Sequence, residues 1–141
     1  MSDATEISRK RSELYLAVAA ALVDTPWRVH RTSPAQIAAP CVWLDSVELS
    51  LDRETSAAFV VAAFPIYIVV DGTVRRQIEE LDDLVAKVWT AAASVGEPQA
   101  SRPTALDVGG PSLRAQALEV DVVIQAVSLC PLDLVTAGGN P

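Results

Sequence analysis

Residues 57–70 read AAFVVAAFPIYIVV, fourteen positions without a charged side chain. The run is apolar at odd and even positions alike, which is typical of a central strand covered on both faces. Because a membrane-spanning helix needs ~20 apolar residues, this shorter run predicts a buried strand and no contact with a membrane. Pro65 interrupts the run, and since proline has no N–H to donate, we expect a bulge or a bend there.

The segments before this strand show a period of two. In residues 41–52, apolar and polar side chains alternate in the manner of a half-exposed strand. The apolar set is Val47, Leu49 and Leu51, and the polar set is Glu48, Ser50 and Asp52. Residues 53–56 are polar and predict the tip of a hairpin. A shorter alternating segment at 27–31 predicts another strand, and the prolines within 32–40 predict a loop.

Two segments have the apolar spacing of half-buried helices. Residues 73–94 carry the clearer stripe, which consists of Val74, Ile78, Leu81, Val85, Val88 and Ala92. Asp71 or Thr73 is the expected N-cap of this helix, and Gly96 is expected to end it. Residues 3–23 predict the other helix. Its buried stripe is Ile7, Leu14, Val18 and either Ala21 or Leu22.

The last third of the chain predicts two strands. We expect a loop over 96–103, a strand at 104–108, a Gly-Gly-Pro turn at 109–111 and a strand at 115–129, with a flexible tail from about residue 132. The order of elements is then α-β-β-β-α-β-β in one domain over residues 1–141. This order predicts an α+β fold, a mostly antiparallel sheet of about four to five strands with two helices packed on one face.

The charge and cysteine content of the chain argue against some classes of partner and site. Lys and Arg number 11 against 18 Asp and Glu, which gives a net charge of −7. Because binding to nucleic acid depends on basic surface, an acidic chain of this kind is not expected to have nucleic acid as its main partner. Cys41 and Cys130 lie far apart and form no CxxC pair, so the sequence predicts neither a disulfide framework nor a zinc site.

Side chains that carry catalysis are few. His30 is the only histidine, and we expect it at the surface without a second imidazole for a metal. A nucleophilic pair of Cys41 and His30 lacks a third residue to orient it. The acidic run Glu79-Glu80 and Asp82-Asp83 is interpreted as a solvated helix face rather than a cation site. We therefore predict no catalytic, cofactor-binding or metal-binding residues and no enzymatic activity.

The tryptophans leave two interpretations open. Trp27 and Trp43 are either core residues or anchors of a subunit interface, where tryptophan is enriched. The core interpretation is favoured because large aromatic side chains dominate buried clusters. Trp89 follows Val88 on the helix stripe, which places it in the core or at its edge.

Several features combine into a family resemblance. They are the leading helix with its alanine-rich end, the strand at 27–30, the proline loop before 41–44, the long strand at 64–71, the helix containing 81–89 and the closing strand at 117–127. In this order they resemble the small tail-terminator, or tail-completion, proteins of phages with long non-contractile tails. The resemblance covers about residues 10–130 and consists of hydrophobic pattern and order.

The resemblance implies a structural role in virion assembly. Proteins of that family cap the head-proximal end of the tail tube as a ring, usually a hexamer, and join it to the head. The implied partners are further copies of this chain, the tail tube protein and the head-side connector protein. DNA is implied only as cargo that passes through the lumen. The implied location is the virion tail, the chain being made in the host cytoplasm, and no cofactor is implied.

The predicted subunit interface comprises Arg28, Arg31, Trp43, Arg53, Glu54 and Thr55. Three alternatives fit the same sequence. A head–tail connector (neck) protein of similar size has much the same pattern. A small bacterial α+β dimer would bind a ligand in a pocket between its sheet and helices. An enzyme would use Cys41 or the acidic helix.

Overall fold

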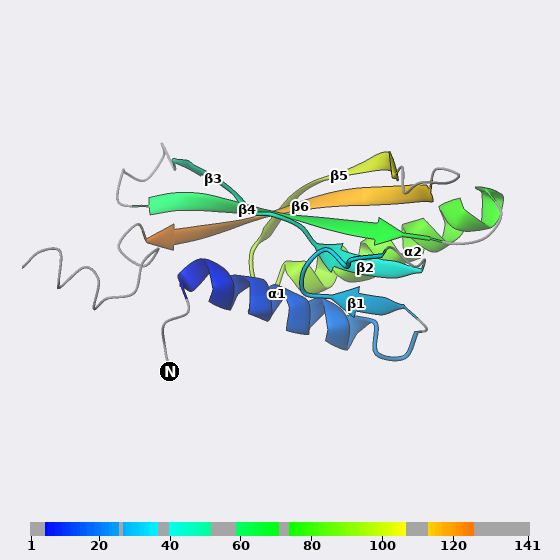
Figure 1. Cartoon of the computed structure of the whole chain (residues 1–141), viewed down its shortest axis with the longest axis horizontal. Helices are drawn as coiled ribbons and strands as arrows, with labels where there is room; N and C mark the ends of the chain where they lie inside the picture. Colours follow the sequence, from blue (N-terminus) through cyan, green and yellow to red (C-terminus); the bar gives the residue numbers. More distant parts are fainter. Residues whose placement is uncertain are drawn as a thin grey trace, which may run out of the picture.

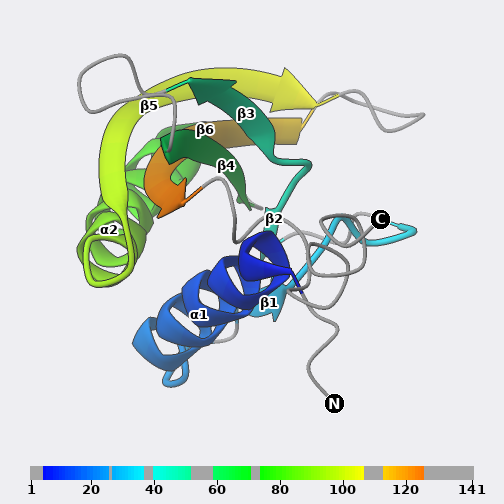
Figure 2. The same ribbon diagram turned by 90° about the vertical axis from the view of Figure 1, so that its left-hand side faces the viewer.

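The computed structural model describes residues 5–25, 27–36, 40–51, 59–70, 74–106 and 113–125 (Figure 1). Their elements follow in the order α1 (Glu6–Ala21), β1 (Arg28–His30), β2 (Cys41–Leu44), β3 (Glu48–Leu51), β4 (Phe59–Val69), α2 (Val74–Ala92), β5 (Glu97–Leu106) and β6 (Leu113–Gln125). The six strands form one sheet, and both helices pack against the same face of it (Figure 2). The predicted α+β fold with helices on one face is confirmed.

The sheet has the order β1-β2-β4-β6-β5, and β3 lies beside the first half of β4. Every pairing is antiparallel except that of β1 with β2, which is parallel. β4 is therefore the central strand that its apolar run predicted. The strand count exceeds the predicted four to five because the segment 41–52 forms two strands where one was expected.

A β-bulge separates β2 from β3. Leu44 lies opposite Ile66 and Glu48 lies opposite Ala63, so three residues on one side face two on the other. An extra residue of this kind bends a strand and interrupts its ladder of hydrogen bonds. The first half of the segment therefore pairs with the end of β4, and the second half pairs with its beginning.

The bulge lies opposite Pro65. The backbone N–H of Asp45 donates to the carbonyl oxygen of Pro65 over 2.8 Å. Since the N–H and C=O of a residue in an antiparallel strand point to the same neighbour, the missing donor of Pro65 faces the interrupted part of the ladder. The irregularity predicted at Pro65 thus falls in the neighbouring strand, while β4 itself pairs with β6 in unbroken register from Phe59 to Val69.

The prediction of a loop over 96–103 was wrong. This segment is the first part of β5, paired with β6 from Glu97 onward. Pro98 and Pro103 made the sequence pattern of this segment typical of a loop. An edge strand nevertheless tolerates proline, because one side of its backbone has no partner strand. β5 is such an edge, with β6 as its neighbour in the sheet.

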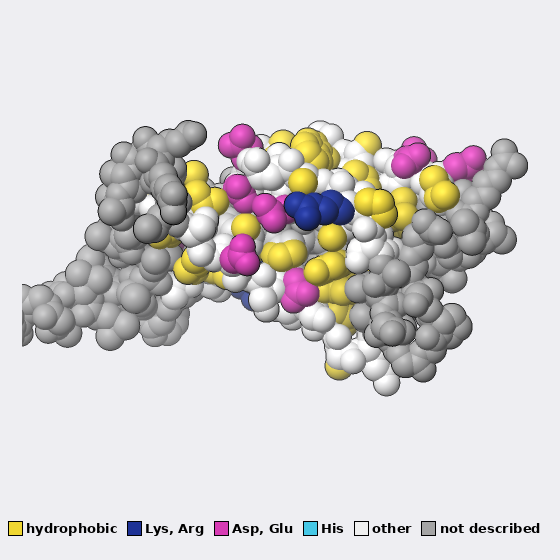
Figure 3. Space-filling model, turned by 90° about the horizontal axis from the view of Figure 1, so that it is seen from above, with side chains coloured by type: hydrophobic (Ala, Val, Ile, Leu, Met, Phe, Trp, Pro, Cys, Tyr) yellow, Lys and Arg dark blue, Asp and Glu magenta, His cyan; other side chains and the backbone are white. Residues whose placement is uncertain are grey.

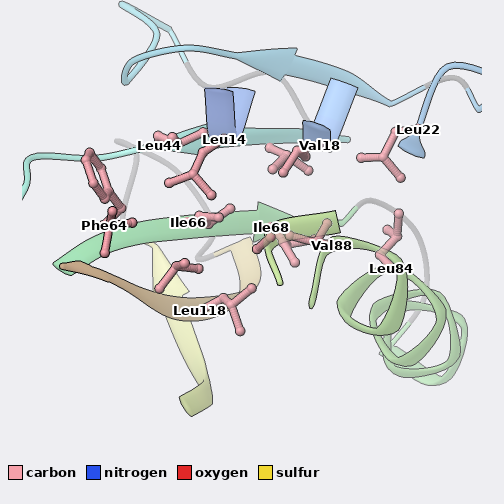
Figure 4. Packing of buried hydrophobic residues seen from close by; sticks show 14 of the residues in the cluster. Leu14, Val18, Leu22, Leu44, Phe64, Ile66, Ile68, Leu84, Val88 and Leu118 are labelled. Carbon is pink, nitrogen blue, oxygen red and sulfur yellow. The ribbon is translucent and has the colours of Figure 1, made fainter. Parts of the chain in front are cut away.

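The core lies between the helices and one face of the sheet (Figure 4). Its largest fully buried side chains include Leu14, Val18 and Leu22 of α1 and its C-cap, Leu44, Phe64, Ile66, Ile68, Val88 and Leu118. Leu22 rather than Ala21 completes the stripe of α1. In α2 the prediction was wrong at Ile78, which is exposed, while Leu84 is buried in its place.

Individual residues determine where the helices begin and end. The hydroxyl of Thr5 accepts a hydrogen bond from the N–H of Ser8 at 3.1 Å, which caps α1. α2 ends at Ala92, and the N–H of Gly96 donates to the carbonyl of Ala92. A Cβ at Gly96 would lie 2.7 Å from the carbonyl oxygen of Asp121, so the turn into β5 has room only for glycine.

Some predicted features lie outside the described residues. They are the N-cap Asp71 or Thr73, the hairpin tip at 53–56, the turn at 109–111, the last part of the strand predicted to reach 129, and the tail from 132. Neither helix in the described part of the chain is long and apolar enough to cross a membrane.

Candidate functional site

The face of the sheet opposite the helices is the main candidate surface, and we call it the open face (Figure 3). Alternation along the strands assigns to it Glu48, Ser50, Val61, Ala63, Pro65, Tyr67, Glu97, Ala100, Arg102, Ala117, Glu119, Asp121 and Val123. All of these side chains are half-buried or exposed. The expectation that β4 is covered on both faces was therefore wrong for this part of the strand, because both helices lie on the other side.

Four carboxylates gather at one end of the open face. The registers place Glu48, Ala63, Asp121 and Glu97 side by side across four strands, and Glu119 lies two positions along β6. Among the described residues, none of these acids forms an ion pair. Figure 3 shows several acidic side chains close to a basic one, and further acidic side chains at the opposite end of the view.

The pKa of Asp121 records this crowding. Partial burial raises the pKa of its carboxyl, and the negative charges of Glu119 and Glu97 raise it further. Each cause disfavours the charged form of the side chain. The open face thus holds like charges together, and within the described part of the chain none of them forms an ion pair, although the guanidinium of Arg102 lines the same hollow as Glu119.

A shallow hollow of about 240 Å³ lies beside the acids. Its lining combines apolar side chains with one guanidinium and one carboxylate. The lining residues are Pro65, Tyr67, Ala100, Arg102, Ala117, Leu118 and Glu119. Pockets for drug-sized ligands generally measure about 300–1,000 Å³. The hollow therefore suits a protruding side chain of a protein better than a small-molecule ligand.

The other end of the same side of the sheet is buried. The rings of Trp43 and Tyr67 stack with their centroids 5.4 Å apart and their planes 26° apart. They belong to a small cluster with Cys41, Val69 and Ala115. Trp43 is only 3% exposed, and its indole Nε1 has no hydrogen-bond partner among the described residues. The core interpretation of Trp43 is confirmed as far as its burial is concerned.

The residues predicted for the interface lie in three different settings. Arg28 is exposed on β1, on the same side of the sheet as Trp43. Arg31 is half-buried and donates to the hydroxyl of Ser12 at 3.0 Å and to the carbonyl and hydroxyl oxygens of Ser8 at 3.1 and 2.9 Å. These bonds fasten the end of β1 to α1. A role for the three residues in subunit contacts stays a prediction.

The remaining predicted interface residues, Arg53, Glu54 and Thr55, lie outside the described residues. The described ones gather around β1 and β2, whereas the four acids lie at the far end of the open face. The structure does not bring the predicted residues to the acids.

Sequence reasoning missed Arg11, which supports the bulge. Its guanidinium donates to the carbonyl oxygens of Asp45 at 2.8 Å, Leu44 at 3.3 Å and Arg31 at 3.4 Å. It also stands 5.4 Å from the centre of the Phe64 ring, within the range of a cation–π contact. A signal for it exists in the sequence, because Arg11 follows Ile7 by four positions and falls on the apolar stripe.

The surroundings of Arg11 act on its charge in opposite directions. Burial lowers the pKa of its guanidinium, and the neighbouring positive charge of Arg31 lowers it further, while Asp45 raises it. An arginine retains its charge through such shifts. A charged donor is thus held against the carbonyl oxygens of Leu44 and Asp45 at the bulge and of Arg31 after the end of β1.

Candidate chemical groups are scattered. The side chain of Cys41 is fully buried, and His30 is half-buried opposite Trp43. Within the described segments, no group of three or more His, Cys, Asp or Glu residues is placed to hold a metal ion. That the chain is not an enzyme stays a prediction.

The helical side carries a second concave surface. An apolar groove of about 670 Å³ runs between α1 and α2 and is lined by Ala17, Ala20, Ala21, Ala86, Lys87, Thr90, Ala91 and Ser94. Leu16 and Val23 are also exposed. Between the helices and the sheet, by contrast, the side chains of the core fill the space (Figure 4).

No protein-family model matches the chain, and no match is found among the curated proteins. The fold and the site define it as a two-layer α+β protein with one open sheet face.

Proposed function

We propose that this chain is a virion assembly protein that caps the head-proximal end of a phage tail tube as a ring and joins the tube to the head-side connector. The pattern of residues 10–130 supports this proposal through its resemblance to tail-terminator proteins. The order of two helices and several strands, with both helices on one face of the sheet, is compatible with it.

The observation that carries the proposal is the open face. Its half-buried apolar side chains are bordered by carboxylates that have no ionic partner in the described part of the chain. An apolar centre with a polar rim is the usual composition of a protein–protein interface. The face offers a broad surface for contact, as a protein that acts by assembly requires.

The two sides of the molecule differ, which suits a ring. A ring requires each copy to present two unlike surfaces, because a head-to-tail contact must close on itself. The sheet side is acidic, and the helical side carries an alanine-lined groove with Leu16 and Val23 exposed nearby. The net charge of −7 suits a lumen through which DNA passes without binding.

A concentration series in native mass spectrometry, followed by negative-stain imaging, tests the proposal. We expect a closed ring, with six copies as the leading expectation. If the chain is monomeric alone, purified tail tubes should recruit it to one end, which also separates a terminator from a neck connector. A dimer that binds no tube end would contradict the proposal.

A pair of charge reversals sharpens this test. Arg28→Glu changes an exposed residue of the predicted interface, and Arg9→Glu makes the same change of charge at an exposed position of α1 that does not line the groove. We expect Arg28→Glu to weaken ring formation or tube capping and Arg9→Glu to leave both intact. Equal behaviour of the two variants would exclude Arg28 from the interface.

A further inference from the structure

The two edges of the sheet differ in what their backbones offer. The hydrogen bond from the Asp45 N–H to the Pro65 carbonyl shows that the odd-numbered residues of β4 direct their backbone groups toward β2 and β3. The even-numbered residues then direct theirs toward β6, because the direction alternates along a strand. The unbroken register of β4 with β6 carries this alternation across the sheet.

The β5 edge is protected. Pro98 and Pro103 lie opposite Val120 and Gln116, two residues of β6 whose backbone groups point toward β4. Both prolines therefore direct their backbone away from the sheet, where each removes a donor. A register shift between Pro98 and Ala100 disturbs the same edge. Proline and bulges are the means by which natural edges avoid unwanted pairing.

The β3 edge has no such protection. Leu49 and Leu51 lie opposite Ala62 and Val60, two residues whose backbone groups point toward β6. Leu49 and Leu51 consequently direct their N–H and C=O groups outward. In the described part of the sheet, β3 pairs with β4 alone, since β1 reaches only β2 (Figure 1). The side chain of Leu49 is 45% exposed.

The charge beside this edge selects the partner. Glu48 projects onto the open face at the end of the row that continues with Asp121 and Glu97. No Lys or Arg occurs between residues 40 and 51. Two copies of β3 paired through Leu49 and Leu51 would place two such acidic rows on one continuous face, and like charges on neighbouring strands repel each other. An added strand that placed basic side chains beside Glu48 would instead be attracted by its carboxylate.

We propose that the β3 edge accepts an extended, basic segment of a partner protein as an added strand. The backbone of Leu49 and Leu51 supplies the hydrogen bonds, and Glu48 sets the preference for a cationic side chain beside it. Strand addition of this kind draws its affinity from the main chain and its specificity from alternate side chains. The proposal does not depend on ring formation, so either can fail while the other stands.

The test uses the full chain labelled with ¹⁵N and an eight-residue peptide in which Val and Lys alternate. At saturating peptide, we expect amide hydrogen exchange to slow at Leu49 and Leu51 and to stay unchanged at the outward residue Ser101 of β5. The matched peptide of alternating Val and Glu should bind more weakly. A Val-Lys peptide methylated on its backbone nitrogens should not bind.

Two variants separate the roles of backbone and charge. Leu49→Pro deletes one outward donor and should abolish the slowed exchange at Leu51. Glu48→Lys leaves the backbone intact and should lower the affinity for the Val-Lys peptide by up to about fivefold while raising that for the Val-Glu peptide. The second variant keeps the proposal testable if the first does not fold.

Two results would overturn the proposal. One is unchanged exchange at Leu49 and Leu51 at millimolar concentrations of the Val-Lys peptide. The other is exchange that slows at these residues as the protein itself is concentrated without peptide, since this would make a second copy of the chain the occupant of the edge.

Discussion

The two faces of β4 have nearly the same composition and opposite surroundings. The even-numbered side chains Ala62, Phe64, Ile66 and Ile68 are fully buried under the helices, whereas the odd-numbered Val61, Ala63, Pro65 and Tyr67 on the open face are half-buried. Hydrophobic sequence alone therefore does not locate the core. The face covered by helices holds the fold together, and the apolar residues of the open face remain available for contact.

Replacing Phe64 is the strongest test of this difference. Phe64 is fully buried at the centre of the core. Phe64→Ala should lower the free energy of unfolding by about 3–5 kcal/mol, because it removes buried apolar area and leaves a cavity. Urea unfolding followed by tryptophan fluorescence measures the change.

The control lies on the same strand. Val61 is half-buried on the open face, opposite Val123 of β6. Val61→Ala should cost less than about 1 kcal/mol, as is usual for positions outside the core. Equal losses for Val61→Ala and Phe64→Ala would mean that the open face is as well packed as the core.

Arg11 connects the helical layer to the edge of the sheet where β2 becomes β3. Arg11→Met keeps most of the side chain's volume but removes the donors to Leu44, Asp45 and Arg31. We expect a loss of about 1.5–3 kcal/mol in the free energy of unfolding, the usual range for hydrogen bonds to a charged group. In addition, hydrogen exchange in β3 should accelerate more than in β5.

Arg9→Met supplies the comparison for Arg11. Arg9 is exposed on the same helix and, among the described residues, forms an ion pair with Glu6 one turn away. Exposed ion pairs of this kind contribute little, so the change should stay within about 0.5 kcal/mol. A loss for Arg9→Met as large as that for Arg11→Met would contradict the assigned role of the bulge contacts.

Trp43 is the largest side chain of the small buried cluster on the side of the sheet away from the helices. Its Nε1 is buried and finds no hydrogen-bond partner in the part of the chain that the structure describes, and an unpaired buried donor carries a desolvation cost. Trp43→Phe removes that donor while it keeps an aromatic ring against Tyr67. The lost volume and the removed cost oppose each other, so we expect a change below about 1.5 kcal/mol by thermal unfolding.

Trp43→Ala tests the same cluster without that compensation. It deletes the ring that stacks on Tyr67 and should cost about 3–5 kcal/mol. If Trp43→Phe proves as damaging as Trp43→Ala, the indole nitrogen has a partner that stabilises the fold.

Periodicity predicted those parts of the fold that local sequence controls. The stripes of both helices follow from burial of one face, so the existence of the helices could be predicted from them. The alternation in 41–52 correctly indicated strand structure, but Cys41–Leu44 is buried at every position and Leu49 is exposed. The loop predicted at 96–103 failed because proline breaks central strands but not edges. Which side of β5 is an edge depends on its place in the sheet, which no local pattern encodes.

The candidate site was less predictable, for the same reason. Glu48, Glu97 and Asp121 lie on three strands and meet only through the register of β4 and β6. Arg11 did carry a local signal, since a charge on an apolar helical stripe requires polar partners in the fold. Those partners, the carbonyls of the bulge, are more than 30 positions away in sequence.

The smallest predicted effect concerns the charge of Asp121 on the open face. Because folding raises the pKa of this carboxyl, the folded chain binds the proton more tightly than the unfolded chain does. This tighter proton binding stabilises the fold in full at pH values below the ordinary Asp pKa of about 4. The stabilisation is lost as the pH rises through the raised pKa of the folded chain.

Asp121→Asn removes the charge and should stabilise the fold at pH 7 by about 0.5 kcal/mol or less. The gain should shrink as the pH falls through that range and as salt screens Glu97 and Glu119. Urea unfolding of both chains at pH 7 and near pH 4, at low and high salt, measures this difference. If the gain in the free energy of unfolding is independent of pH and salt, repulsion among the acids is not its cause. The main electrostatic argument for a cationic partner on the open face would then fail.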